Sequence, residues 1–456
     1  MKKDAILKEQ APEKAMFTNR YLLKLLWPLF VEQLLVYAVG LTDSVMVAGV
    51  GEAAVSAVSL VDSLMVLVIT ILIALSTGGA VLVGQFLGQG KEEKANRAAD
   101  QLVLFAVLLS LVIIVFMYVF RNLLISLIFG DIENDVLTYC NTYYTIVLAS
   151  IPFMAIYNAG SALFRSVGNS NISMQASILM NVINISGNAV LLYGFHMGIE
   201  GVAFPTLVSR AAAAAMMLFL LKNQDRRVHM SRKFVLRPDW SLIRKILKIG
   251  VPNGIENSMF QLGKLILLSM ISGFGTASIT ANAVANTASL IAVLPGMAMG
   301  YGVVSVISIC VGAGDYRQVR FYARKLTKWV YGVMTVTNVL MIIAIPFILN
   351  IYGLSRETGE IAAALIFANC APAVFIWPLS FTLPNVLRAA GDVMFTMVVG
   401  VASMWIFRIF FGVFLGEFMG IGVLGVWIAM VVDWVVRSLC FCIRYRSGRW
   451  KHEAVA

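Results

Sequence analysis

The chain has 456 residues, of which 60% are hydrophobic and only 13% are charged, and its mean hydropathy is +0.86. A water-soluble protein of this length needs a polar surface that this composition does not supply, so we expect a lipid bilayer as its solvent. The net charge of +11 would suggest a nucleic-acid ligand in a soluble protein, but the placement of the basic residues explains it better, and no nucleic-acid partner is expected.

Apolar segments long enough to cross a bilayer, about 20 residues each, recur along the whole chain. They predict an all-α integral membrane protein with twelve transmembrane helices. In the first half the predicted segments are 22–48, 55–84, 101–120, 137–163, 173–195 and 200–221. In the second half they are 249–274, 280–309, 326–350, 361–387, 395–416 and 421–443.

Basic residues gather in the connections on one side of these segments. Lys and Arg are dense near the N-terminus, in 222–248 and in the C-terminal tail, whereas the opposite connections hold only Arg121 and Arg356. By the positive-inside rule, we expect a multi-pass protein of the cell inner membrane with both termini in the cytoplasm. The polar start lacks the apolar core of a signal peptide. Binding of acidic membrane lipid is a secondary role for these basic residues.

No enzymatic or nucleotide-binding motif accompanies the segments. A phosphate-binding loop G-x-x-x-x-G-K-[ST] is missing, because Gln85 stands where Gly90-Lys91 would need the first glycine. The three histidines do not form H-E-x-x-H, and the five cysteines include no C-x-x-C pair that would indicate a zinc site or a disulfide framework. We therefore expect no enzyme activity and no cofactor, and an ion gradient as the energy source.

The chain repeats itself at an offset close to 224 residues. WPLFVEQ, with Glu32, matches GVPNGIEN, with Glu256, and the turns LGQG, FRSVGNS and MGIEGVAF match VGAG, LRAAGDV and IGVLGVWI. Halves of six segments enter the membrane in the same direction, so the repeat is parallel, with a pseudo-twofold axis along the membrane normal. We expect an N-terminal lobe, 1–222, and a C-terminal lobe, 223–456, that rock against each other. A duplicated channel or structural protein is the alternative.

At these motifs the chain resembles the multidrug and toxic compound extrusion (MATE) family of cation-coupled exporters. The resemblance is carried by LTDSVMVAGVG, LGQG, FRSVGNSN and NVINISGNAVLLYGFHMGIEGVAF and extends from about Ala15 to Arg446. It implies a monomeric secondary antiporter that exports amphipathic organic compounds in exchange for H⁺ or Na⁺, with small organic substrates and membrane lipids as its partners. The alternative is a flippase or exporter of a lipid-linked or metabolite substrate in the same superfamily. A membrane enzyme or a non-transporting scaffold is a third hypothesis.

The resemblance also implies an ion-coupling site in the N-terminal half. Asp43 matches the acidic coupling residue of the family, and its repeat partner is Leu267. Family positions also place Tyr143, Asn158, Asn184, Asn188 and Thr206 in this site. One branch of the family has a second carboxylate at the position of Asn188, so the oxygens here suit a Na⁺ cage, with polar packing between helices as the alternative. The sodium-site glutamate of another branch is replaced by Phe260 in the C-terminal half.

Other polar side chains in the segments are candidates for the substrate cavity or for secondary coupling, because an ionised group in a bilayer costs about 2.5–3.5 kcal/mol. If Asp62 faces Asp43, repulsion and desolvation make them a proton-sharing pair, with structural pairing as the alternative. Glu32 lies on the same helix face as Asp43, and Glu32 and Glu256 are either cavity acids or symmetric structural residues.

A polar stripe and one further pair complete the candidates. Asn257, Gln261 and Lys264 follow one face of the seventh segment. If Lys264 is buried it needs a partner, and Glu256 and Asp43 are the candidates. Arg408 and Asp433 are expected to form a buried ion pair. In this inventory the acids Glu32, Asp43, Asp62, Glu256 and Asp433 outnumber the bases Lys264 and Arg408. This balance favours hydrophobic cations as cargo, whereas a flippase for a pyrophosphate-linked lipid needs a strongly cationic cleft.

Overall fold

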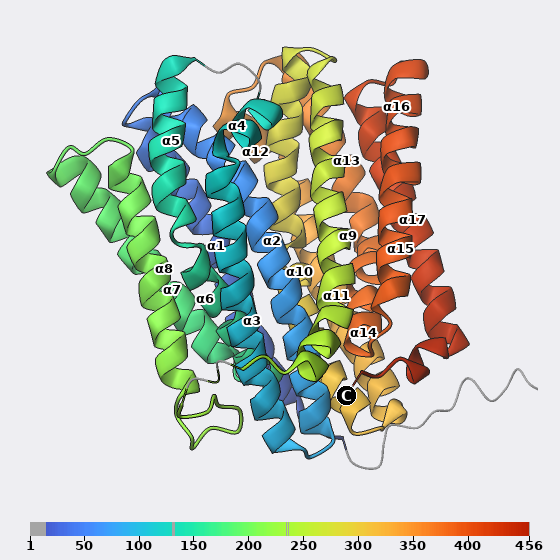
Figure 1. Cartoon of the computed structure of the whole chain (residues 1–456). Coiled ribbons are helices and arrows are strands. Elements are labelled where there is room, and N and C mark those ends of the chain that lie inside the picture. The colour runs from blue at the N-terminus through green and yellow to red at the C-terminus, as the bar shows by residue number, and fades with distance from the viewer. Residues whose placement is uncertain (1–14, 130–132, 234, 236, 456) are drawn as a thin grey trace, which may run out of the picture.

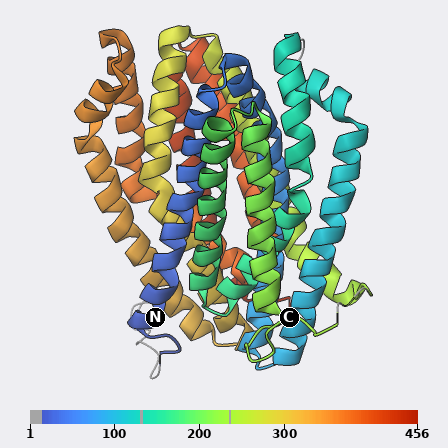
Figure 2. The same ribbon diagram turned by 90° about the vertical axis from the view of Figure 1, so that its left-hand side faces the viewer.

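The computed structural model describes residues 15–129, 133–233, 235 and 237–455, and the described residues form helices without any strand. The long helices run side by side along one direction (Figure 1). Both ends of the described chain lie at the same end of this bundle (Figure 2). We call it the basic end, because the 222–239 connection also lies there, and we call the other the opposite end.

The first half of the chain forms eight α-helices among its described residues. They are α1 (Asn19–Ala48), α2 (Glu52–Gly88), α3 (Glu92–Val119), α4 (Arg121–Phe129), α5 (Asn134–Leu148), α6 (Ile151–Ser166), α7 (Ser170–Ala189) and α8 (Glu200–Leu221). A π-helical turn, Val190–Gly194, extends α7.

The second half follows the same order of long helices. Its α-helices are α9 (Trp240–Ser272), α10 (Thr276–Gly312), α11 (Tyr316–Ile343), α12 (Ile345–Tyr352), α13 (Arg356–Trp377), α14 (Leu383–Ala389), α15 (Val393–Ser403), α16 (Phe411–Val413) and α17 (Val423–Ser447). π-Helical segments at Pro378–Thr382, Met404–Phe410 and Phe414–Phe418 join α13 to α14 and extend α15 and α16, and a 3-10 turn, Arg449–His452, follows α17.

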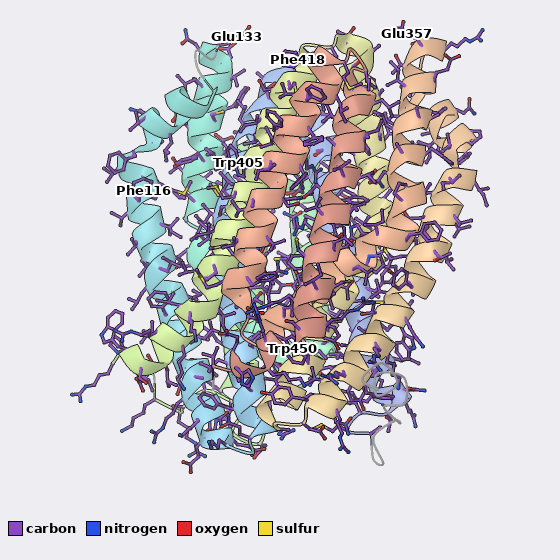
Figure 3. All side chains as sticks on the ribbon, turned by 90° about the vertical axis from the view of Figure 1, so that its right-hand side faces the viewer. Phe116, Glu133, Glu357, Trp405, Phe418 and Trp450 are labelled. Carbon is purple, nitrogen blue, oxygen red and sulfur yellow. The ribbon has the colours of Figure 1, made fainter. Side chains whose placement is uncertain are left out.

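Among the described residues, ten helices are long and apolar enough to cross a membrane, and one bent pair raises the number to 11. The remaining long helix is α9, with 33 residues. Its polar stripe of Asn257, Gln261 and Lys264, together with Glu256, lowers its hydropathy. The flanks of the bundle expose large apolar side chains, such as Phe116 and Trp405, between Glu133 and Glu357 at the opposite end and Trp450 at the basic end (Figure 3). This pattern is typical of a bundle surrounded by lipid.

The predicted fourth segment, 137–163, is not one straight helix. It is divided into α5 and α6, which meet at an angle of 46°. Pro152 stands in the first turn of α6, where the missing backbone N–H of proline breaks no hydrogen bond of the helix. Tyr143 and Asn158, expected on one helix, therefore lie on two.

Buried apolar side chains form two clusters, one for each half of the chain. The beginnings of α1 and α9 are exchanged between them. Leu22, Leu25 and Leu29 of α1 pack in the cluster of the second half. Ile246 and Ile249 of α9 pack in the cluster of the first half. The halves are therefore interlocked towards the basic end.

Small residues let the two halves approach closely at this end. A Cβ atom on Gly88 of α2 would collide with the backbone carbonyl of Ile309 on α10, and one on Gly312 would collide with the backbone of Gln85. Contacts of this kind between glycines and backbone are typical of tightly packed membrane helices. The C-terminal tail crosses the same place, because the N–H of Val455 donates to Oε1 of Gln85 at 3.0 Å.

We expect Gly88→Leu to destabilise this closed arrangement by about 1–3 kcal/mol, because the new side chain has no space between α2 and α10. The measurement is the thermal unfolding midpoint of the purified protein in detergent. Gly332→Leu is the matched control, since nothing lies within 4 Å of a Cβ at this helical glycine. Equal midpoints for the two variants would show that the close approach does not stabilise the fold.

Candidate functional site

A chain of polar side chains joins three helices of the N-terminal half. Nδ2 of Asn188 on α7 donates to Oδ1 of Asp43 on α1 at 2.6 Å, and it lies 3.4 Å from Oδ1 of Asn184. Nδ2 of Asn184 donates in turn to the hydroxyl of Thr206 on α8 at 3.2 Å. Oδ1 of Asn188 is buried and has no hydrogen-bond partner within the described chain. The structure therefore brings four of the predicted coupling residues into one network.

Asp62 on α2 has a different partner. The hydroxyl of Tyr143 donates to Oδ1 of Asp62 at 3.3 Å. Asp43 and Asp62 interact electrostatically, but no hydrogen bond joins their carboxyl groups in the described residues. Each carboxylate accepts a hydrogen bond from another helix instead, and a proton-sharing pair stays a prediction.

Arg210 on α8 belongs to the same region and was missed from the sequence. It interacts electrostatically with both Asp43 and Asp62. Its Nη1 donates to Oγ of Ser150, in the bend between α5 and α6, at 2.7 Å. The available signal was an arginine inside the apolar segment 200–221, where a charged side chain needs a partner.

Asn158 on α6 does not join this network. Its side chain is buried, and its Nδ2 has no hydrogen-bond partner in the part of the chain that the structure describes. The family position of Asn158 is therefore present, but the structure does not connect it with Asp43.

Glu32 lies in a buried ion pair towards the basic end. Its Oε1 accepts from Nη1 of Arg165 at 3.1 Å, and its Oε2 accepts from the hydroxyl of Ser173 at 2.9 Å. The hydroxyl of Tyr157 is a further donor at 3.4 Å. Since Glu32 is only 3% exposed, this ion pair joins α1, α6 and α7 in the protein interior.

Glu256 has the equivalent arrangement in the C-terminal half. Nη2 of Arg388 lies 2.7 Å from both of its carboxylate oxygens, and Nη2 of Arg437 donates to Oε1 at 3.2 Å. At the repeat offset, Glu32 and Arg165 correspond to Glu256 and Arg388. The two glutamates thus form equivalent buried ion pairs in the two halves, and their structural role stays a prediction.

The remaining charged groups lie around Phe260 on α9. Nζ of Lys264 is 5.0 Å from the centre of the Phe260 ring, and Cζ of Arg408 is 5.2 Å from it. Nη1 of Arg408 lies 3.9 Å from Oδ2 of Asp433, so the predicted pair forms, although the groups are too far apart for a hydrogen bond. The other carboxylate oxygen of Asp433 accepts from the hydroxyl of Ser403.

The expected partners of Lys264 are already engaged. Glu256 binds two arginines and Asp43 binds Asn188, so the prediction that Lys264 pairs with either carboxylate is wrong. Of the other stripe residues, Asn257 donates to the backbone carbonyl of Asn253 at 2.9 Å, and Gln261 is half-buried. Helical spacing identified the polar face of α9, but it did not show which neighbouring helix faces it.

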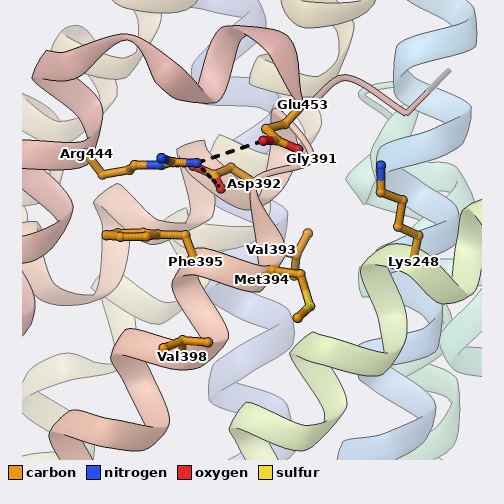
Figure 4. Close-up of a pocket in the computed structure, with 9 residues that line it drawn as sticks. All are labelled: Lys248, Gly391, Asp392, Val393, Met394, Phe395, Val398, Arg444 and Glu453. Atoms are coloured by element: carbon orange, nitrogen blue, oxygen red, sulfur yellow. Dashed lines mark hydrogen bonds and ion pairs between the residues drawn. The ribbon is translucent and has the colours of Figure 1, made fainter.

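A separate pocket lies at the basic end and contains its own charges. Nε and Nη2 of Arg444 donate to the two carboxylate oxygens of Asp392 at 2.6 and 3.0 Å. Glu453 of the C-terminal tail lies 3.9 Å from Arg444, and Lys248 of α9 lines the other side (Figure 4). None of the predicted coupling residues lines this pocket.

Comparison with known proteins identifies the architecture. A family model described as MatE matches residues 28–190 and 252–414, two copies whose starts are 224 residues apart. The uncharacterized transporter YisQ of Bacillus subtilis is 26% identical over 100% of both chains. The probable multidrug resistance protein NorM of Thermotoga maritima is 24% identical over 99% of this chain and 97% of its own.

Solved structures support the same fold. A crystal structure of MATE in the bent conformation superimposes with a TM-score of 0.87, at 18% identity, over 95% of this chain and 96% of that one. The match covers nearly the whole of both chains, so the two halves, their connections and the long helices correspond to one known fold.

Removing one carboxylate of a buried ion pair leaves its cations unpaired. We therefore expect Glu256→Gln, which leaves Arg388 and Arg437 without a counter-charge, to lower the free energy of unfolding by about 3–5 kcal/mol. Glu360→Gln is the control, because its pair with Arg356 is exposed at the surface and is worth at most about 1 kcal/mol. Denaturant unfolding of both purified variants in the same detergent measures the difference. A Glu256→Gln protein as stable as the control would contradict the structural role.

Proposed function

The chain belongs to the MatE family, and from this premise we propose that it is a secondary antiporter that exports amphipathic organic compounds in exchange for H⁺ or Na⁺. Its relatives include probable multidrug resistance proteins, and its many apolar helices form a multi-pass membrane transporter. The observation that supports ion coupling is the network of Asp43, Asn188, Asn184 and Thr206.

A carboxylate with amide and hydroxyl oxygens around it suits a small cation. Asp43 accepts a hydrogen bond from Asn188, while Oδ1 of Asn188 remains unpaired. Oxygen ligands of this type coordinate Na⁺, and a carboxylate also binds H⁺ directly. Binding of either ion neutralises Asp43, which lowers the cost of enclosing it in a dry, closed cavity. Ion occupancy thereby becomes linked to the conformation of the transporter.

Movement of the two halves provides the transport step in this proposal. Residues 1–222 and 223–456 form two lobes related by a pseudo-twofold axis, and α9 supplies the twelfth span. The lobes touch at the glycines of α2 and α10 near the basic end, and alternating access requires this contact to open. Because one chain contains both lobes, a monomer suffices.

The expected charge of the substrate depends on the balance of all acidic and basic side chains inside the helices, and the inventory from the sequence left out several arginines. Arg165, Arg210, Arg388 and Arg437 also lie in the helices and contact the intramembrane acids. The excess of acids over bases therefore disappears, and it no longer favours hydrophobic cations. Cationic cargo stays a prediction. The position of unpaired charged side chains is a better guide to the charge of the substrate than the total number of acids and bases.

The basic end should face the cytoplasm, since positively charged connections are retained on that side of the membrane. In a cysteine-free background, Lys233→Cys should resist labelling by an impermeant maleimide added outside intact cells. Glu133→Cys, at the opposite end, should be labelled under the same conditions. Both positions are exposed, so accessibility of the side chain does not confound the comparison. The reverse pattern would invert the proposed topology.

The proposed coupling role predicts that Asp43→Asn abolishes gradient-driven export while the protein still inserts in the membrane. Asparagine keeps the size and hydrogen-bonding capacity of the side chain but removes the full charge and the titration. Transport in proteoliposomes is measured under a pH gradient and a Na⁺ gradient applied separately, which also identifies the ion. Asp135→Asn is the control, because Asp135 is exposed at the start of α5. Full export by a well-inserted Asp43→Asn protein would refute the assignment.

A further inference from the structure

Three cationic side chains surround one aromatic ring in the C-terminal half. Lys264, Arg408 and Arg437 lie 5.0, 5.2 and 6.0 Å from the centre of the Phe260 ring. Lys264 and Arg408 also repel each other electrostatically. A ring face attracts cations, but it offers no oxygen to accept their N–H groups. This concentration of positive charge in a membrane helix bundle therefore needs an anionic partner.

The described residues leave these cations incompletely paired, because Nε of Arg408 and of Arg437 and Oδ2 of Asp433 are buried without a hydrogen-bond partner. Arg437 donates to Glu256, which is shared with Arg388. Arg408 has only the loose contact of 3.9 Å with Asp433, and its buried Nε has no hydrogen-bond partner.

Lys264 has even less compensation. Within the part of the chain that the structure describes, no hydrogen bond or ion pair reaches its ammonium group, and the side chain is exposed on one side. Asp433 pairs with Arg408 alone, so the positive charge of Lys264 has no counter-charge in an ion pair within the described residues.

The internal repeat relates Lys264 and Arg408 to positions in or near the polar network of the N-terminal half. At the offset of 224 residues, Arg408 corresponds to Asn184, and Lys264 corresponds to Gly40, one turn before Asp43. The C-terminal half therefore has a cation, Arg408, at a position that belongs to the polar network of the N-terminal half, and a second cation one turn from the position of Asp43. A purely structural requirement of the duplicated fold would call for similar residues in both halves, and these positions differ.

We propose that Lys264 and Arg408 bind the anionic group of an amphipathic substrate, such as a carboxylate, sulfonate or phosphate. The planar guanidinium of Arg408 suits two oxygens of such a group, and the ammonium of Lys264 adds a mobile point charge. Phe260 holds both cations on one side of the site. Calling the ligand a substrate rests on the proposed transport function, whereas its anionic chemistry rests on the charges alone.

Equilibrium binding tests this site without any gradient. The purified chain is placed in nanodiscs of phosphatidylcholine, and binding of carboxyfluorescein, an aromatic anion, is followed by fluorescence anisotropy. Tetramethylrhodamine methyl ester, with a similar ring system and a positive charge, is the matched probe. Empty nanodiscs give the background. We expect carboxyfluorescein to bind more tightly than the cationic probe.

Substitutions then identify the residues. Lys264→Gln breaks no ion pair and should weaken carboxyfluorescein binding about tenfold or more, as expected for the loss of a charged contact. Arg408→Gln combined with Asp433→Asn should do the same without leaving a buried carboxylate unpaired. Asp433→Asn alone should strengthen binding, because it frees Arg408. Lys328→Gln, an exposed lysine of α11, should leave binding unchanged.

The source of the anion is distinguished by adding phosphatidylglycerol to the nanodiscs. Displacement of carboxyfluorescein would support the site and identify a lipid headgroup as its ligand, whereas undiminished binding would support a soluble anionic substrate. Equal affinities of the unmodified chain and Lys264→Gln would overturn the proposal. If that result accompanied Asp43-dependent transport, only this site would fail. Anion binding without any gradient-driven transport would instead refute the antiporter function and leave the site standing.

Discussion

Hydrocarbon offers no hydrogen bonds to an ionised side chain, so a charge inside the bundle is costly unless another group of the protein or a ligand pairs with it. This constraint fixes the helices towards the basic end. Glu32 joins α1 to α6 and α7 through Arg165 and Ser173, and Glu256 joins α9 to α14 and α17 through Arg388 and Arg437. Of these helices, α1 and α9 are the two whose first turns pack in the apolar cluster of the other half. The ion pairs thus fasten α1 and α9 to their own halves where apolar packing draws them towards the other.

Nearer the opposite end of the bundle, equivalent positions in the two halves carry side chains of different charge. Asp43 corresponds to Leu267, and Asn184 corresponds to Arg408. Asp43 is held by Asn188, whereas Arg408 lacks a full complement of acceptors. The repeated sequence motifs in the two halves therefore carry different side chains at these few positions. In the proposed mechanism the N-terminal half binds the coupling cation and the C-terminal half binds the substrate.

Apolar length predicted the helices well, because crossing a bilayer requires a minimum number of residues. The segment 200–221 coincides with α8, and 173–195 ends one residue after the π-helical turn that extends α7. The site was less predictable. Arg165 and Arg388 lie in the repeated motifs FRSVGNS and LRAAGDV, but the motifs alone did not show that their side chains reach Glu32 and Glu256. Periodicity gives the polar face of a helix, whereas partners depend on the rotation of neighbouring helices, which is why Lys264 was misassigned.

The location of the ion pairs also bears on how easily the halves separate. The pairs of Glu32, Glu256 and Asp433 with their arginines each join residues of one half only. Breaking a buried pair by removing its partner costs about 3–5 kcal/mol, so pairs across the interface would strongly resist rocking. The contacts across the basic end are of a weaker kind: backbone packing at Gly88 and hydrogen bonds through Gln85, worth about 0.5–1.5 kcal/mol each. In the proposed mechanism, opening this end therefore leaves the buried ion pairs of both halves intact.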